Sequence, residues 1–366
     1  MNRRDVLLGG AAAVTWLSGL RAASAADEIV IGAIYPMSGA SAQIGVDARH
    51  ALETAVDIVN GVHDLDLPCA KTAGISSLGG AKIRLVIADH QADPQKGRAE
   101  AERLITQEKV VAILGSFHSS VSATVSATCE RYAIPFVAAD SSSPSLHRKG
   151  LKFFFRPAAH DEFFSTAMFD FLDAQKAAGA KVDTISLFYE DTIFGTDSSN
   201  IQRKLAGERG YKIAADVKYR ANSPSLTSEV QQLKSADADV LMPSSYTTDA
   251  LLLVKTMAEL GYKPKNMLAQ AAGFSEKAVF DAVGDKLEGL ISRASFALDL
   301  APKRKSIGAV NEMFKARAGR DINDNTSRLL TACLTLCDAI DRSGSDRKSS
   351  RLNSSHIPLS RMPYSA

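Results

Sequence analysis

Residues Val110–Asp140 read VVAILGSFHSSVSATVSATCERYAIPFVAAD. The stretch begins with a fully apolar segment, 110–114, which predicts a buried β-strand. A helix is expected at 121–132, and a second apolar strand at 134–138. Because strands joined through a helix are typical of parallel sheets, the stretch predicts one β-α-β unit of an α/β fold.

The same alternation of apolar strands and amphipathic helices continues on both sides of this unit. Further strands are expected at 28–34, 82–89, 184–189, 213–219, 240–243 and 267–269, and further helices at 48–60, 94–108, 161–177, 197–209, 226–235, 247–260 and 328–340. The pattern predicts an α/β protein with two parallel sheets, each flanked by helices on both faces. Since ligands of such sheets bind beyond the carboxyl ends of the strands, we expect a ligand cleft between the sheets.

The first 25 residues predict an export signal. Arg3-Arg4 precedes an apolar run at 6–20, and the small residues Ala23-Ser24-Ala25 suit cleavage before Ala26. The apolar run is shorter than the roughly 20 residues that a membrane-spanning helix needs. We therefore expect a periplasmic protein, exported by the twin-arginine route or by the ordinary one.

Composition and charge exclude several classes of protein. The 366 residues are 45% hydrophobic and 23% charged, as in globular proteins, and the length suggests two domains. The net charge of +2 comes from the ends, because residues 1–25 carry +2 and residues 345–366 carry +3. The remaining segment, 26–344, is slightly acidic, which argues against nucleic-acid binding.

Four cysteines, Cys69, Cys129, Cys333 and Cys337, form no CxxC pair. Cys333 and Cys337 lie one turn apart on an expected helix, which is a poor geometry for a disulfide. Export permits disulfides, but burial of these side chains as small apolar groups is the simpler interpretation. Their disulfide state stays open.

Sequence motifs of enzymes are absent. The chain has no GxSxG, HExxH, GxGxxG or phosphate-loop motif. His118 could pair with Ser119 or Ser142 in a hydrolase, but adjacency in sequence establishes no geometry. Glu190 and Asp191 are neighbours on a loop, where carboxylates usually face solvent. We predict no catalytic residue, no metal and no cofactor.

Two loops that follow adjacent strands predict an anion site. Gly115–Ser120 leads from a buried strand into a helix, and Asp140–Pro144 follows the next strand in the same way. The free amides and hydroxyls at a helix N-terminus suit a carboxylate. The alternative is that Ser119 and Ser142 only cap helices.

Four segments in order carry a resemblance to a known family. They are Tyr35-Pro36-Met37-Ser38-Gly39, Gly115–Ser120, Ser142–Leu146 and Tyr189-Glu190-Asp191-Thr192-Ile193-Phe194-Gly195. Together they resemble the leucine/isoleucine/valine-binding type of periplasmic solute receptor, which serves ABC importers, over residues 28 to about 340. The resemblance implies the type I periplasmic binding fold, in which two Rossmann-like lobes joined by three crossovers close around a ligand.

The resemblance also implies how the chain is divided and which residues bind ligand. The first lobe would contain 27–157 with 297–335, and the second 158–296 with the chain end. The implied site residues are Ser119, Ser142, Asp140, Ser141, Tyr246, Phe194, Ile44, Tyr35 and Ala272. The two serines would hold a ligand carboxylate, helped by the backbone of residues 140–141. Tyr246 would reach across from the second lobe, and the other large side chains would form walls.

The chain departs from the family pattern in three places, the first of which bears on the ligand. Ala272 stands where branched-chain amino-acid binders have an acid that pairs with the ligand ammonium. Either the ligand has no ammonium, or Asp140 supplies the charge. Ala92 and His118 stand at the positions of a family disulfide, and the loop 61–80 is longer than usual.

The segment 345–366 is polar and aperiodic, and it resembles a translated sequencing-adaptor read-through. We expect the natural C-terminus to be lost from about Ser345, together with the third crossover.

The expected function is that of a monomeric, non-enzymatic protein that delivers a small carboxylated solute to the membrane permease of an ABC importer. The solute would be an amino acid or an aromatic or aliphatic acid. The alternatives are a periplasmic amide, urea or amino-acid sensor that reports to a signalling partner, and the Ser/His hydrolase. The sequence names neither ligand nor permease.

Overall fold

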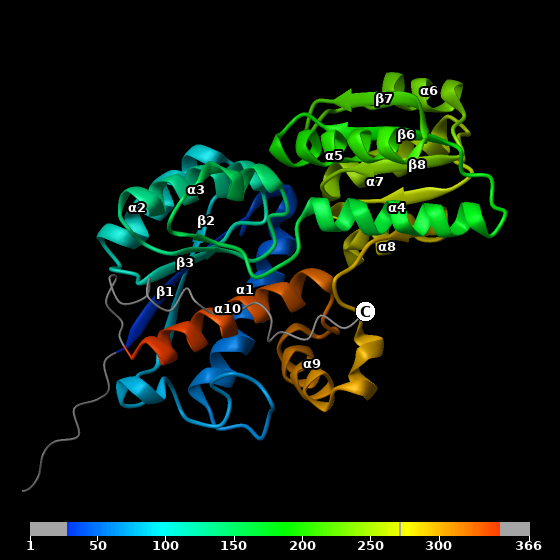
Figure 1. The fold of residues 1–366 in the computed structure, drawn as a ribbon. Coiled ribbons are helices and arrows are strands. Elements are labelled where there is room, and N and C mark those ends of the chain that lie inside the picture. The colour runs from blue at the N-terminus through cyan, green and yellow to red at the C-terminus, as the bar shows by residue number, and fades with distance from the viewer. Residues whose placement is uncertain (1–27, 271, 345–366) are drawn as a thin grey trace, which may run out of the picture.

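The computed structural model describes residues 28–344 except 271, and it omits the side chains of 272, 277 and 278 (Figure 1). The predicted export signal, 1–25, and the predicted foreign tail, 345–366, lie outside the described residues. All four cysteines are free thiols, of which Cys69 is partly exposed and the other three are buried.

The first sheet has five parallel strands in the order β2-β1-β3-β4-β5. The strands are β1 (Ile29–Tyr35), β2 (Ile83–Asp89), β3 (Ala112–Gly115), β4 (Phe136–Ala138) and β5 (Phe154–Phe155). Helix α1 (Ala42–Asn60) packs on one face, and α2 (Pro94–Thr106) and α3 (Ser119–Arg131) pack on the other. The alternation along β1 sends Ile31 and Ala33 toward α1 and Ile34 toward α2 and α3.

The second sheet also has five parallel strands, in the order β10-β9-β8-β6-β7. They are β6 (Thr184–Glu190), β7 (Lys212–Tyr219), β8 (Val240–Ser244), β9 (Met267–Ala269) and β10 (Leu290–Ser292). Helices α4 (Asp161–Ala177) and α5 (Ile193–Arg209) cover one face, and α6 (Thr227–Ala236), α7 (Thr247–Glu259) and α8 (Lys277–Val283) cover the other. Two parallel sheets with helices on both faces confirm the predicted fold class.

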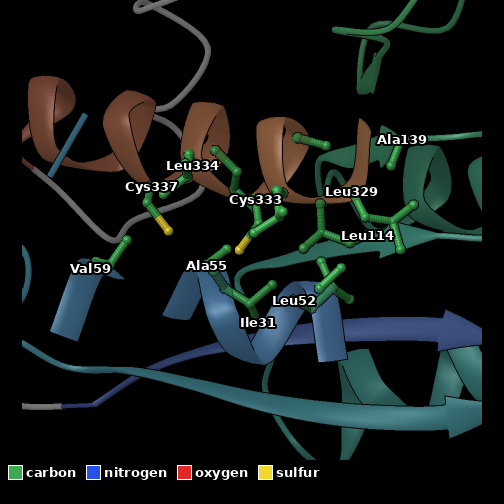
Figure 2. Packing of buried hydrophobic residues seen from close by; sticks show 14 of the residues in the cluster. Ile31, Leu52, Ala55, Val59, Leu114, Ala139, Leu329, Cys333, Leu334 and Cys337 are labelled. Carbon is green, nitrogen blue, oxygen red and sulfur yellow. The ribbon is translucent and has the colours of Figure 1, made fainter. Parts of the chain in front are cut away.

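After the second sheet the chain returns to the first one. Helices α9 (Lys305–Ala318) and α10 (Asp324–Ser343) both pack against α1, which lies more than 240 residues earlier (Figure 1). In the core between α1 and α10, Cys333 lies opposite Leu52 and Ala55 (Figure 2). We call each sheet with the helices packed on it a lobe. Residues 156–160 and 293–304 are the crossovers between the lobes.

The remaining elements of residues 28–344 are six short 3-10 helices. They are η1 (Gly39–Ser41), η2 (Ser76–Leu78), η3 (Pro144–Lys149), η4 (Ala272–Ser275), η5 (Gly284–Leu287) and η6 (Leu298–Lys303). Across the described ranges, no helix combines the length and apolarity needed to cross a bilayer.

The sequence pattern predicts the longer elements best. The helix at 161–177 and the strand at 267–269 are confirmed to the residue, and the helix expected at 328–340 extends to 324–343. That helix begins earlier because Asn323 and Thr326 form a capping box, in which each side chain accepts a hydrogen bond from the other residue's backbone N–H. Strands β5 and β10, with two and three residues, are too short to show a period.

The packing of α10 generates a stability prediction. Leu329 is fully buried between α10 and the first sheet, so Leu329→Ala should lower the free energy of unfolding by about 2–5 kcal/mol. Thr331→Ala, at an exposed position on the same helix, is the matched control and should change it by less than about 1 kcal/mol. Urea unfolding of the two variants tests this, and equal losses would contradict the packing.

Candidate functional site

The carboxyl ends of the two sheets face each other across a cleft, and one contact between the lobes joins Ser119 to Tyr246. Ser119 is the first residue of α3, directly after the loop that follows β3. Its backbone N–H donates to the Tyr246 hydroxyl at 3.3 Å, and its own buried Oγ has no hydrogen-bond partner among the described residues. Tyr246 precedes α7 in the second lobe, so this contact bridges the lobes.

Aromatic rings from both lobes surround Tyr246. Its ring centroid lies 5.5 Å from that of Phe117, 4.7 Å from that of His118 and 5.0 Å from that of Phe194. Phe117 and His118 belong to the loop after β3, whereas Phe194 lies in the first turn of α5. Tilted rings at these separations attract one another, so the cluster favours a closed arrangement of the lobes.

Asp140 links the two loops of the first lobe that the sequence analysis identified. Its Oδ1 accepts a hydrogen bond from the Phe117 N–H at 3.0 Å, and Arg328 of α10 donates to its carbonyl oxygen at 3.1 Å. Burial raises the pKa of Asp140 to about 6, against the opposing effect of Arg328. Its Oδ2 is buried without a partner in the described part of the chain.

The two serines after Asp140 are engaged by the protein itself. The hydroxyls of Ser141 and Ser122 are in close contact, and Ser141 also donates to the Phe117 carbonyl at 3.3 Å. The Ser142 carbonyl accepts the Asp161 N–H at 2.9 Å, and its hydroxyl stabilises the Asp161 carboxylate. Burial nevertheless raises the pKa of Asp161.

A charged cluster at the crossovers was not predicted from the sequence. Arg293 lies 3.2 Å from Asp324, stacks 3.5 Å above the ring of Phe164, and has its pKa lowered to about 10 by burial. Arg328 lies 3.1 Å from the same Asp324. Glu276, from the loop before α8, faces this cluster, and burial raises its pKa to about 7.

Asp324 and Arg328 lie one turn apart on α10, but Arg293, Glu276 and Phe164 come from other segments, 31 to 160 residues before Asp324, so spacing in the sequence does not bring the cluster together. Asp324 could be noticed only as a first-turn acid of a helix, a common structural feature.

A second contact between the lobes involves Asp197 on α5. Its carboxylate accepts hydrogen bonds from the Ser143 hydroxyl and from the Ser145 N–H, the latter at 3.1 Å. Because Ser143 is the N-cap residue of η3, Asp197 of the second lobe caps a helix of the first lobe. We call this contact the Asp197 latch.

The other predicted site residues have the following places. Tyr35 is fully buried at the end of β1, and its hydroxyl has no partner among residues 28–270 and 272–344. Ile44 is buried in the same core of the first lobe. Phe194 contacts Tyr246, as described above. The Ala272 side chain lies outside what the structure describes.

A cleft of about 210 Å³ lies between the lobes. Loops after β1, β2 and β3 line one side, and loops after β6, β7 and β8 line the other. His118, Ser120 and Tyr246 reach this cleft, whereas Ser119 is covered. A larger cavity of about 430 Å³, near Met257, lies within the second lobe alone, so closure of the lobes does not change its walls.

Catalytic geometry is absent from the described site. Neither His118 Nδ1 nor Ser119 Oγ has a hydrogen-bond partner there, and burial lowers the pKa of His118 to about 3. The Glu190 carboxylate is not free for catalysis, because it accepts hydrogen bonds from the N–H groups of Thr192 and Gly195. These bonds hold the loop before α5 in place.

Comparisons with known proteins agree with this fold. A family model described as periplasmic binding protein matches residues 28–354. The chain is 30% identical over 267 residues to Leu/Ile/Val-binding protein homolog 7 of Brucella abortus, covering 72% of this chain and 63% of that protein. It therefore spans less than two thirds of that relative's length.

Two solved structures are similar in fold. A leucine binding protein from Thermotoga maritima has a TM-score of 0.77 and 22% identity, with 89% of this chain and 86% of that one covered. An ABC transporter solute-binding protein from R. palustris in complex with 4-hydroxybenzoate has a TM-score of 0.76 and 18% identity, with 90% and 84% covered. The matched proteins are solute-binding proteins, not enzymes.

The raised pKa of Asp140 generates a pH prediction. The folded protein keeps this proton up to about pH 6, whereas the unfolded chain loses it near pH 4. The folded state therefore binds more protons in this window, and its stability falls as the pH rises from 4 to 6. Asp140→Asn removes this loss.

The unfolding temperature of Asp140→Asn minus that of the wild type should therefore be larger at pH 8 than at pH 4. Asp299→Asn, at an exposed position, controls for the loss of one negative charge. If the unfolding temperatures of Asp140→Asn and the wild type differ by the same amount at both pH values, the pKa of Asp140 is not raised.

The Asp197 latch generates a prediction about closure. Asp197→Ala should increase the radius of gyration measured by small-angle X-ray scattering, because it removes two hydrogen bonds that hold the lobes together. Asp170→Ala removes a carboxylate that pairs with Arg209 within the second lobe, and should leave the radius unchanged. A compact Asp197→Ala protein would show that the latch does not hold the lobes.

Proposed function

Because the chain belongs to the periplasmic binding protein family, we propose that it is the solute-binding component of an ABC importer and binds a small carboxylate by closure of its lobes. The family implies a periplasmic location, with which the predicted export signal agrees. The observation that carries the carboxylate proposal is the Ser119–Tyr246 contact at the start of α3.

The start of α3 suits a carboxylate for two reasons. The Ser119 N–H already donates to an oxygen, that of Tyr246, and a charged carboxylate oxygen accepts such a bond better than a phenol does. The Ser119 Oγ beside it is buried without a partner in the described site and can donate a second bond. Together with the partial positive charge of the helix N-terminus, these groups favour an anion. A ligand would reach them as the lobes open and Tyr246 withdraws.

The surrounding rings favour an aromatic acid. Phe117, His118, Phe194 and Tyr246 present ring faces and edges near this anion site, and burial keeps His118 neutral at pH 7. The cleft of about 210 Å³, which His118, Ser120 and Tyr246 line beside the covered Ser119, is large enough for one six-membered ring with its carboxylate. A protein of similar fold is solved with 4-hydroxybenzoate, which has that shape.

An α-amino acid is the second candidate, and the buried acids favour it. Asp140 and Glu276 have raised pKa values because burial penalises their charged forms. A ligand ammonium beside them would compensate their charge, and they would take the place of the acid that branched-chain amino-acid binders have at the position of Ala272. The relatives named for leucine and for Leu/Ile/Val support this alternative.

A thermal unfolding panel separates these ligands. The full chain is heated with benzoate and hydroxybenzoates, aliphatic acids, branched-chain amino acids and, as uncharged controls, benzamide and urea. A ligand at a thousand times its dissociation constant adds about 4 kcal/mol to stability, which is easily detected. We expect a shift with aromatic acids and none with benzamide. A shift only with amino acids selects the second candidate, and a shift only with amides overturns the carboxylate site.

Ser119→Ala tests the anion site itself. It should weaken binding of the identified acid by about 1–3 kcal/mol, because the ligand carboxylate loses a buried donor. Ser126→Ala is the matched control, since this buried hydroxyl on the same helix donates to the Ala123 carbonyl at 3.2 Å. Equal affinities of the two variants, measured by calorimetry, would place the carboxylate elsewhere.

A further inference from the structure

The first crossover between the lobes brings two histidines and a glutamate together. His147 lies in η3 of the first lobe, His160 is the N-cap residue of α4, and Glu162 lies in the first turn of α4 in the second lobe. One nitrogen of each imidazole and one carboxylate oxygen lie within 4.8 Å of one another. The two imidazole centroids are 4.6 Å apart.

These three groups are ligands that Zn²⁺ prefers. A tetrahedral zinc ion with bonds of about 2.0–2.1 Å holds its ligand atoms about 3.3 Å apart, so the side chains must approach by about 1.5 Å at most. His147 is exposed and can move, and its open side admits water as a fourth ligand.

Two arginines occupy parts of this site and would compete with a metal. Arg148 contacts the Glu162 carboxylate, and its side chain is 60% exposed, so it can leave at little cost. Arg156 donates to His147 Nδ1 at 2.9 Å and to the Ser143 carbonyl at 2.8 Å. Their positive charges weaken cation binding, so replacing an arginine with a neutral residue should strengthen it.

We propose that His147, His160 and Glu162 form a binding site for a divalent cation of the zinc class at the first crossover. The ion would tie η3 of the first lobe to the first turn of α4 in the second lobe. It would restrain the hinge rather than contact a ligand in the cleft. This proposal is independent of the ligand proposed above.

Titration of the untagged full chain with Zn²⁺ by calorimetry tests the site, and Co²⁺ absorption in the visible range reports its geometry. We expect one zinc per chain with at least a tenfold loss of affinity in His147→Ala and in His160→Asn. The asparagine keeps an N-cap side chain at α4, so folding is preserved. His63→Ala, a histidine that bonds to the Asp57 carbonyl elsewhere, is the control and should bind as the wild type does.

Arg148→Gln makes an opposite prediction. Removal of the competing guanidinium should tighten zinc binding several-fold, whereas a surface site unrelated to Glu162 would be indifferent to it. The proposal is overturned if the wild type binds no zinc, or if a His147→Ala/His160→Asn double variant binds it as tightly. It is also overturned if Arg148→Gln binds zinc no more tightly than the wild type.

Discussion

The arrangement of the site depends on the buried carboxylate of Asp140. It accepts the Phe117 N–H from the loop after β3, while the Asp140 carbonyl receives Arg328 from α10. Three segments that are distant in the sequence thus meet at one residue. Burial opposes the charged form, which the raised pKa of about 6 records, and the hydrogen bond and Arg328 compensate only in part. Because this residue holds the loop that precedes α3, the position of Ser119 follows from it.

The charged cluster at the crossovers has a similar character. Asp324 is approached by Arg293 and Arg328 at 3.2 and 3.1 Å, and all three side chains are largely buried. Desolvation costs about as much as such buried pairs gain, so they add little net stability. Their directional contacts instead fix how the second crossover lies against α10. A fixed crossover restricts how the lobes can move. Such a restriction is needed for Asp197 to reach Ser143 and Ser145 when the lobes close.

The sequence predicts the fold well because strands and helices differ in period. A short apolar run such as 110–114, directly followed by a segment with helical period, favours a buried strand, and the alternation of such runs with helices predicts parallel sheets. The site is predicted less well. The loops after β3 and β4 could be identified from their serines and their place beyond strand ends. No local pattern predicts that the Ser142 carbonyl accepts a hydrogen bond from Asp161, or that Glu276 lies near Asp324. Both contacts depend on the path of the crossovers.

Closure links these features to function. A ligand shifts the lobes toward the closed state only by the difference in its affinity for the two states. Contacts such as Tyr246 with Ser119, and Asp197 with Ser145, stabilise closure without any ligand and so reduce the difference that a ligand must supply. The two contacts act differently, however. The Tyr246 hydroxyl occupies the donor that a ligand carboxylate would use, so a ligand must replace this contact, whereas it can keep the Asp197 latch. On the proposed function, the latch would add to ligand affinity, and the Tyr246 contact would select for ligands with an acceptor stronger than a phenol.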